Sequence, residues 1–249
     1  MTAMLASVRT LDEALFALEA GADFIDLKEP SQGALGALDH AAVRVCVQAI
    51  GGRRPVSATI GDIVSMDPRE MTAAVERMAA TGVDYIKIGL FVHPRVFDCV
   101  KALTVLADRA QLVAVIFADE PWSMDPSPSG RGAGVRDDLI ALTNALADAG
   151  FAGAMLDTAH KTGKTLRDWR KDGELRDFVK TSGSLGLLTG LAGSLRKVDV
   201  PPLLKIEPDY LGFRGALCSG SNRNQNLDSG AFAKIRSAIP ELESIGLPL

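Results

Sequence analysis

The chain has 249 residues, of which 47% are hydrophobic and 23% are charged, so it has ample apolar material for a globular core. A formal net charge of -4 provides no basic footprint for nucleic acid or for an anionic membrane surface. Three scattered cysteines argue against a disulfide framework or a zinc site and fit a reducing compartment. Since the chain also lacks a signal-peptide pattern and a bilayer-length apolar run, we expect a cytoplasmic protein.

Short apolar segments alternate with helical segments along the whole chain. A capping box at Thr10 opens the first helix, and Asp39 and Asp67 are suitable N-cap residues for the next two. We expect strands at 5–8, 24–30, 55–61, 85–90, 112–118, 154–158, 185–191 and 211–215. Later helices are expected at 93–109, 136–149, 165–181, 196–205 and 229–239.

This alternation predicts an α/β fold built on a parallel sheet. The strands are rich in Val, Ile, Leu and Ala without polar alternation, which is typical of parallel strands covered by helices. A doubly wound open sheet is the competing architecture. The count of eight units, the chain length and the lack of a Gly-x-Gly-x-x-Gly before the first helix favour a closed (β/α)8 TIM barrel. No linker divides the sequence, so we predict one domain over residues 1–249.

Charged residues mark every second predicted strand near its C-terminal end. Asp26 and Lys28 share a face with Phe24 and not with the intervening Ile25 and Leu27. Corresponding charges occur at Lys87, Asp157 and Arg214 on the later even-numbered strands. Because side chains of alternate strands fill one layer of a barrel, we expect these charges to converge at its C-terminal mouth.

Several buried charges in one place destabilise a fold unless they pair or take part in chemistry. The structural explanation is a pair of salt bridges, Lys28–Asp26 or Lys87–Asp157. The chemical explanation is that neighbouring lysines lower each other's pKa, which gives a neutral amine able to form a Schiff base with a carbonyl. Asp157, or whichever lysine remains free, would then move protons. Asp26 is expected to bind substrate, and Lys161 either points into the mouth or is a solvated loop lysine.

A phosphate site is predicted after the seventh and eighth strands. Gly193 and Ser194 lie at the start of a short helix, where backbone amides of barrels commonly bind phosphate. Arg214 and Gly215, after strand eight, would supply the other half. The alternatives are a tight turn that needs glycine and a structural role for Arg214.

Other motifs carry no function here. Gly163-Lys164-Thr165 lacks the earlier glycine of a P-loop, since position 158 is Thr158. The three histidines share no metal spacing, so no metal site or cofactor is predicted. Glycines between 130 and 134 lie in a Pro/Ser-rich loop over 119–134, which is either a lid or simply flexible.

The combined motifs closely resemble the (5-formylfuran-3-yl)methyl phosphate synthase family, also called 4-(hydroxymethyl)-2-furancarboxaldehyde-phosphate synthase. The resemblance covers nearly the whole chain and is carried by Asp23-Phe-Ile-Asp-Leu-Lys-Glu-Pro30, Gly33-Ala-Leu-Gly36, Ser57-Ala-Thr-Ile-Gly-Asp62, Asp84-Tyr-Ile-Lys-Ile-Gly89, Met155-Leu-Asp-Thr158, Lys161, Gly163-Lys-Thr-Leu166 and Leu191-Ala-Gly-Ser-Leu-Arg196. Two segments depart from the family pattern. The loop at 120–134 is longer and richer in Pro and Ser, and Ser219-Gly-Ser-Asn-Arg-Asn224 replaces a version with glycine and aspartate.

The resemblance implies a class I aldolase-like barrel that joins two glyceraldehyde 3-phosphates into one phosphorylated furan aldehyde. One phosphate and two waters are lost, and the product feeds methanofuran or methylofuran biosynthesis. By position the Schiff-base lysine is Lys28, the proton-accepting lysine is Lys87, and the further catalytic residues are Asp157 and Lys161. The alternatives are a simple class I triose-phosphate aldolase and a non-catalytic barrel that binds a phosphorylated metabolite. A homo-oligomer is expected from the usual habit of such barrels.

Overall fold

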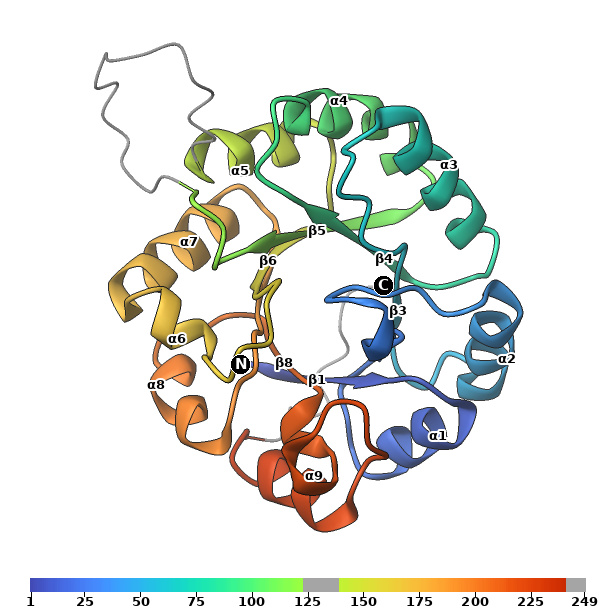
Figure 1. Ribbon diagram of the computed structural model, residues 1–249, viewed down its shortest axis with the longest axis vertical. Helices are drawn as coiled ribbons and strands as arrows, with labels where there is room; N and C mark the ends of the chain where they lie inside the picture. Colours follow the sequence, from blue (N-terminus) through green and yellow to red (C-terminus); the bar gives the residue numbers. More distant parts are fainter. Residues whose placement is uncertain (123–138, 241–249) are drawn as a thin grey trace.

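The structure is a computed structural model in which residues 1–122 and 139–240 are described. Eight parallel strands pair in sequence order and the eighth pairs with the first, which closes a barrel (Figure 1). The strands are β1 (Ala3–Val8), β2 (Phe24–Leu27), β3 (Val56–Thr59), β4 (Tyr85–Leu90), β5 (Gln111–Phe117), β6 (Gly153–Asp157), β7 (Leu188–Leu191) and β8 (Tyr210–Phe213). The predicted (β/α)8 barrel is therefore confirmed, and the open sheet is excluded. The single domain over 1–249 stays a prediction.

Helices form the outer ring around the strands (Figure 1). They are α1 (Leu11–Glu19), α2 (His40–Ile50), α3 (Pro68–Ala79), α4 (Val96–Ala107), α5 (Leu139–Asp148), α6 (Leu166–Trp169), α7 (Asp172–Ser184), α8 (Val200–Leu204) and α9 (Ser229–Arg236). Thr10, Asp39 and Asp67 accept backbone N–H bonds at the starts of α1, α2 and α3, which confirms the predicted caps. No helix in the described ranges is long and apolar enough to cross a membrane.

The segment predicted as one helix after Thr165 is divided into α6 and α7. Arg170 lies between them in an extended conformation. Its guanidinium donates to the carbonyl oxygens of Ala118 at 3.0 Å and Glu120 at 3.1 Å, just beyond β5. The helical periodicity predicted one continuous helix, which was wrong. The hydrogen bonds of Arg170 to the segment after β5 outweigh the local helical preference. The expected helix start near 136 and most of the loop at 119–134 lie outside the described residues.

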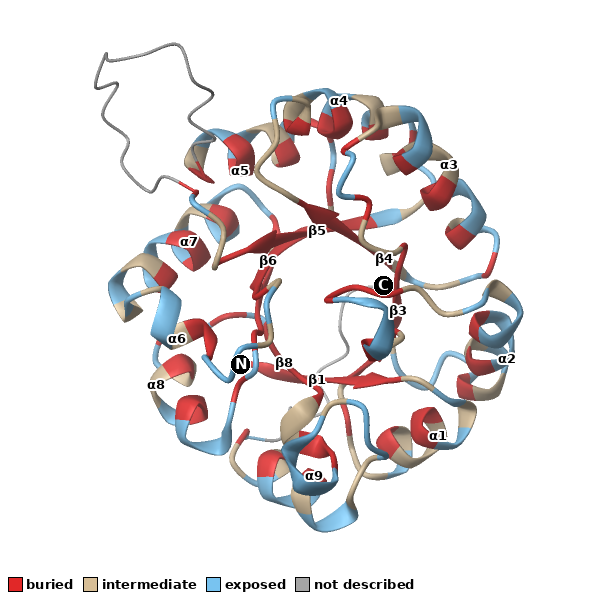
Figure 2. Cartoon of the chain, in the orientation of Figure 1, coloured by how far each residue is buried: buried red, intermediate tan, exposed pale blue. Residues whose placement is uncertain are grey.

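Two groups of apolar residues stabilise the barrel, and Figure 2 shows the strands as its most buried part. One lies between the strands and the helices. The other fills the interior, where Phe24 packs between Tyr85 and Tyr210 with ring centroids 6.1 and 5.7 Å away. Gly190 makes room for Tyr210, since a Cβ there would lie 2.3 Å from the ring. These aromatic residues fill the interior below the charged layer.

Candidate active site

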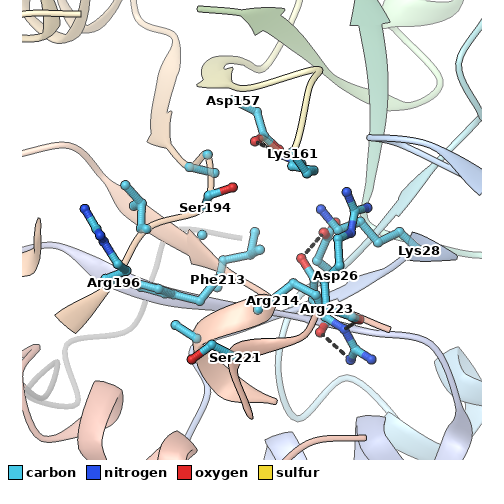
Figure 3. A pocket seen from close by; sticks show the side chains of 18 of the residues that line it. Asp26, Lys28, Asp157, Lys161, Ser194, Arg196, Phe213, Arg214, Ser221 and Arg223 are labelled. Carbon is cyan, nitrogen blue, oxygen red and sulfur yellow. Dashed lines mark hydrogen bonds and ion pairs between the residues drawn. The ribbon is translucent and has the colours of Figure 1, made fainter. Parts of the chain in front are cut away.

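A cavity of about 360 Å³ opens at the C-terminal ends of the strands. Lys28, Lys87, Asp157 and Lys161 all line it, so the structure brings together the residues predicted to be catalytic. Figure 3 shows Lys28, Asp157 and Lys161 around this cavity. The predicted substrate-binding residues line the same cavity: Asp26, Gly193, Ser194, Arg214 and Gly215. Their side chains and backbones come from the ends of β2, β4, β6, β7 and β8.

Asp26 is the centre of the deepest polar cluster. Its carboxylate accepts hydrogen bonds from the hydroxyls of Ser7 and Ser57, each at 2.7 Å, and forms an ion pair with Lys87 at 3.0 Å. Burial alone would raise the pKa of Asp26, but Lys87, Lys28 and the two hydroxyls outweigh it and lower the pKa. The Asp26 carboxylate is therefore ionised at neutral pH and joins β1, β2, β3 and β4.

Lys28 differs from Lys87 because it has no partner. The residue is 7% exposed, and its ammonium makes no hydrogen bond or ion pair with any described residue. Burial is the largest effect on its pKa, which falls from 10.5 to about 8. Asp157 and Asp26 oppose this fall, while Lys161 and Lys87 add to it. Neighbouring lysines were the expected cause, but desolvation outweighs them.

Asp157 and Lys161 form the second ion pair of the mouth, at 3.0 Å. The same carboxylate accepts a 2.7 Å bond from the backbone N–H of Thr158, and Lys161 also donates to the Thr158 carbonyl at 2.6 Å. Burial would raise the pKa of Asp157, yet Lys161, Lys28 and the hydrogen bonds lower it to about 2. The ion pairs are thus Lys87–Asp26 and Lys161–Asp157, and neither of the two salt bridges considered from the sequence forms.

The loop after β7 lines the cavity with Gly193 and Ser194. Gly193 and Ser194 both have positive φ, 115° and 50°, and their N–H groups donate to no acceptor within the described residues. The first helical turn, η2 (Lys197–Asp199), begins only after this loop, so these groups belong to a turn and not to a helix start. A Cβ on Gly193 would lie 3.0 Å from Thr158, so this turn favours glycine. A turn of this kind, with N–H groups that have no acceptor in the described part of the chain, is suited to binding an anion.

Arg214 is held by the protein itself. It forms an ion pair with Glu13 of α1, and both side chains are buried. Its remaining donors reach the carbonyl oxygens of Ser7, Arg223 and Gln225 at 3.2, 2.9 and 2.9 Å. All five N–H donors of the guanidinium are used in this way. This geometry favours the structural alternative for the Arg214 side chain, while Gly215 still lines the cavity.

Three residues that sequence reasoning missed shape the mouth. Asp62 accepts N–H bonds from Ala34 and Leu35 and fixes the loop after β2. Asp119 accepts N–H bonds from Ala159 and His160 and fixes the loop that carries Lys161. Arg223 lines the cavity from the segment that departs from the family pattern. The sequence signal that could have indicated Asp62 and Asp119 as site residues is their position just after strands β3 and β5.

The fold and the site define an aldolase-like TIM barrel whose charged mouth contains a buried lysine, Lys28, without a partner among residues 1–122 and 139–240. Comparison with known proteins identifies the family within this class. Residues 4–236 match the family model described as 4-HFC-P synthase, and the chain belongs to that family.

Named relatives support an enzyme. A relative in Methylorubrum extorquens, provisionally named (5-formylfuran-3-yl)methyl phosphate synthase, is 42% identical over 236 residues, which cover 95% of this chain and 91% of that one. The Methanopyrus kandleri protein of the same name is 35% identical, with 89% and 92% covered. Among solved structures, phosphoribosyl anthranilate isomerase from Thermotoga maritima has a TM-score of 0.64 at 12% identity, with 96% and 98% covered, which concerns the fold alone.

Proposed function

We propose that this protein is a lyase that condenses two molecules of glyceraldehyde 3-phosphate into 4-(hydroxymethyl)-2-furancarboxaldehyde phosphate. The observation that carries the proposal is Lys28, a buried amine with no partner among the described residues and a pKa of about 8. A lysine in this state is partly neutral at physiological pH and can attack a carbonyl. The family match and the names of the relatives support the furan phosphate product. The triose phosphate substrate and a role in methanofuran or methylofuran biosynthesis are part of this proposal.

The reaction begins when Lys28 Nζ adds to the carbonyl carbon of one triose phosphate and water leaves. The resulting iminium acidifies the neighbouring C–H bond, and a base removes that proton to give an enamine. The enamine carbon then attacks the aldehyde of the second triose phosphate and forms the new carbon–carbon bond. Elimination of one phosphate, ring closure and dehydration follow, and hydrolysis of the imine frees Lys28. The net change is loss of one phosphate and two waters.

Each charged neighbour has a distinct part in these proton transfers. Asp157 is ionised, since its pKa is about 2, and therefore acts as a proton acceptor. Lys87, which the resemblance implies to be a proton acceptor, is paired with the ionised Asp26 at 3.0 Å, so we assign it the role of a proton donor instead. Lys161, 3.0 Å from Asp157, has the same role, and both would protonate the leaving water and phosphate oxygens. Asp26 holds Lys87 in place and lies on the face of β2 from which Lys28 also enters the mouth.

The backbone N–H groups of Gly193, Ser194 and Gly215 bind a substrate phosphate in this proposal. They lie after β7 and β8, where barrels commonly bind phosphate, and have no competing acceptor in the described residues. Arg214 supports the second loop through Glu13 and leaves the phosphate contact to the backbone.

Purified protein incubated with glyceraldehyde 3-phosphate tests the proposal. We expect free phosphate and ultraviolet absorbance of the furan aldehyde to rise together in equal amounts. A sugar bisphosphate without phosphate release would instead identify a simple class I aldolase. Binding of triose phosphate without turnover over hours would identify a non-catalytic binding protein.

Borohydride trapping tests the nucleophile. Reduction in the presence of substrate should add the substrate mass to the peptide containing Lys28, and Lys28→Arg should remove both the adduct and turnover because a guanidinium forms no imine. Lys164→Arg is a matched control, since Lys164 lies over the Trp169 ring, outside the cavity. An adduct on Lys87 or Lys161 with Lys28 unmodified would contradict the assignment.

A further inference from the structure

The loop after β8 places another cation, the guanidinium of Arg223, at the rim of the cavity. Arg223 follows the 3-10 turn η4 (Ser219–Ser221) and lines the same cavity as Lys28 and Asp157. Lys87, Lys161 and Arg214, which line the same cavity, each pair with a carboxylate, that of Asp26, Asp157 and Glu13 respectively. Arg223 forms no ion pair with any carboxylate of the described residues.

The protein holds Arg223 firmly from two directions. Its backbone carbonyl accepts a 2.9 Å bond from Nε of Arg214, and its Nη2 donates to the carbonyl of Gly33 at 2.7 Å. Gly33 belongs to the loop that Asp62 fixes after β2, and a Cβ at Gly33 would collide with Asp62. The guanidinium is therefore positioned before any ligand arrives, which reduces the entropy lost on binding.

Most of the hydrogen-bonding capacity of Arg223 remains unused. A guanidinium has five N–H donors, and only the donor to Gly33 has a partner within the described part of the chain. Burial lowers the pKa of Arg223, and the carboxylates of Asp157 and Asp62 only partly offset this effect. A partly desolvated cation with free donors beside a cavity is stabilised when an anion binds it.

We propose that Arg223 forms a second phosphate subsite, which binds the phosphate of the second triose phosphate through its planar, two-pronged guanidinium. The subsite rests on the proposed function for the identity of its ligand. Arg223 belongs to the loop after β8, as does Gly215, whereas Gly193 and Ser194 belong to the loop after β7. Figure 3 shows Ser194 and Arg223 entering the cavity from these separate loops. Two anion subsites around Lys28 let the barrel hold both phosphorylated substrates together, which promotes a bimolecular condensation.

The alternative role for Arg223 is a latch that only joins the loops at 33–36 and 219–224 through its bond to Gly33. A latch and a phosphate ligand respond differently to substitution. Loss of a latch lowers the midpoint of thermal unfolding but leaves phosphate stoichiometry unchanged. Loss of a ligand removes a phosphate, and Arg223→Lys should restore binding partly, since an ammonium keeps the charge but not the bidentate geometry.

Calorimetric titration of the full chain with inorganic phosphate, at constant ionic strength, tests the subsite. We expect two phosphates bound by the wild type and by Arg109→Gln, a control that removes one exposed arginine at the opposite end of the barrel. Arg223→Gln should bind one phosphate, or bind the second at least about tenfold more weakly, as expected for a lost charge-assisted hydrogen bond. Identical isotherms for Arg223→Gln and the wild type would overturn the proposal, whatever the number of sites.

The same variants separate the subsite from the proposed function. If the wild type does not turn over glyceraldehyde 3-phosphate but Arg223→Gln still loses phosphate binding, the function fails and the subsite stands. If the wild type turns over substrate and Arg223→Gln keeps its isotherm and its KM, the subsite fails and the function stands. Circular dichroism and the unfolding midpoint of each variant show that the fold is retained.

Discussion

The ammonium of Lys87 lies 3.0 Å from the carboxylate of Asp26, and both side chains are nearly inaccessible to solvent, at 4% and 1% exposed. The pair spans two strands that are not neighbours in the barrel, since β3 lies between β2 and β4. Ser57 of β3 completes the connection through its 2.7 Å bond to Asp26. The pair thus fixes the positions of three strands at the base of the cavity.

Removing both partners of this pair should cost less than the sum of removing each one alone. Lys87→Met and Asp26→Asn each leave an uncompensated buried group, and we expect a loss of about 3–5 kcal/mol of unfolding free energy for the single change at Lys87. The double variant should be less destabilised than the sum of the two single variants. Urea unfolding of all three measures this coupling, and additive losses would show that the contact contributes no net interaction.

The pH dependence of imine formation should follow the pKa of Lys28. Because only the neutral amine attacks, the rate of borohydride trapping should rise about tenfold per pH unit below 8 and level off above it. The folded pKa lies below the unfolded value of 10.5, so the unfolded chain binds the extra proton between these values. The contribution of Lys28 to stability therefore rises with pH across that window. A trapping midpoint near 10 would show that Lys28 is solvated.

Two substitutions should move this midpoint in opposite directions. Asp157 raises the pKa of Lys28, so Asp157→Asn should lower the trapping midpoint below 8. Lys87 lowers that pKa, so Lys87→Met should raise the midpoint. Trapping rates measured across pH for the two variants check this, and shifts of the same sign would contradict the charge arrangement of the mouth.

Arg214 should prove to be a stability residue. Arg214→Met leaves buried Glu13 with only the more distant Arg9 as counter-charge and leaves three carbonyl oxygens without this donor, which should cost about 3–5 kcal/mol of unfolding free energy. Glu13→Gln, which also breaks the pair but stays outside the cavity, should destabilise comparably. Urea unfolding measures both. A stable Arg214→Met protein with a raised KM would instead make Arg214 a substrate ligand.

Asp119 should act by positioning the loop after β6. Its side chain is 1% exposed and accepts the N–H groups of Ala159 and His160 at 2.7 and 2.8 Å. In Asp119→Asn only one amide oxygen remains as acceptor, so hydrogen exchange at these two amides should accelerate and turnover should fall. Asp39→Asn, which alters the cap of α2, is the control. Unchanged exchange at 159 and 160 in Asp119→Asn would remove this role.

Most of the fold followed from local sequence patterns. Apolar strands, N-cap residues such as Thr10 and a count of eight units predicted the closed barrel, because each of these signals is local. The parity of β2 also indicated that Asp26 and Lys28 enter the interior with Phe24. The gathering of charges from even-numbered strands followed from the symmetry of a barrel.

The partners of each charge could not be predicted in the same way. Lys87 pairs with Asp26 and not with Asp157 because the register brings the end of β4 beside β2 through β3. The guanidinium of Arg214 is held within the protein because Glu13 of α1, roughly 200 residues earlier in the chain, pairs with it. Arg223 lies in an irregular loop, where no periodicity predicts the direction of its side chain. Its position in the loop after the last strand is the sequence feature that could have suggested a role at the cavity.

The Lys87–Asp26 and Lys161–Asp157 ion pairs belong to different halves of the chain, whereas the Arg214–Glu13 pair joins the two halves. Asp26 and Lys87 come from the first four strands, while Asp157 and Lys161 come from the last four, so each half carries one carboxylate with its own counter-charge. A chain divided at the exposed turn between Asp108 and Arg109 would therefore yield two fragments that are each balanced at their own pair. Lys28 would remain in the first fragment but would lose Asp157 and Lys161, half of the charges that set its pKa. The lowered pKa of Lys28 therefore depends on both halves of the barrel. Mixing the two fragments would restore this pKa only if they assemble into a closed barrel.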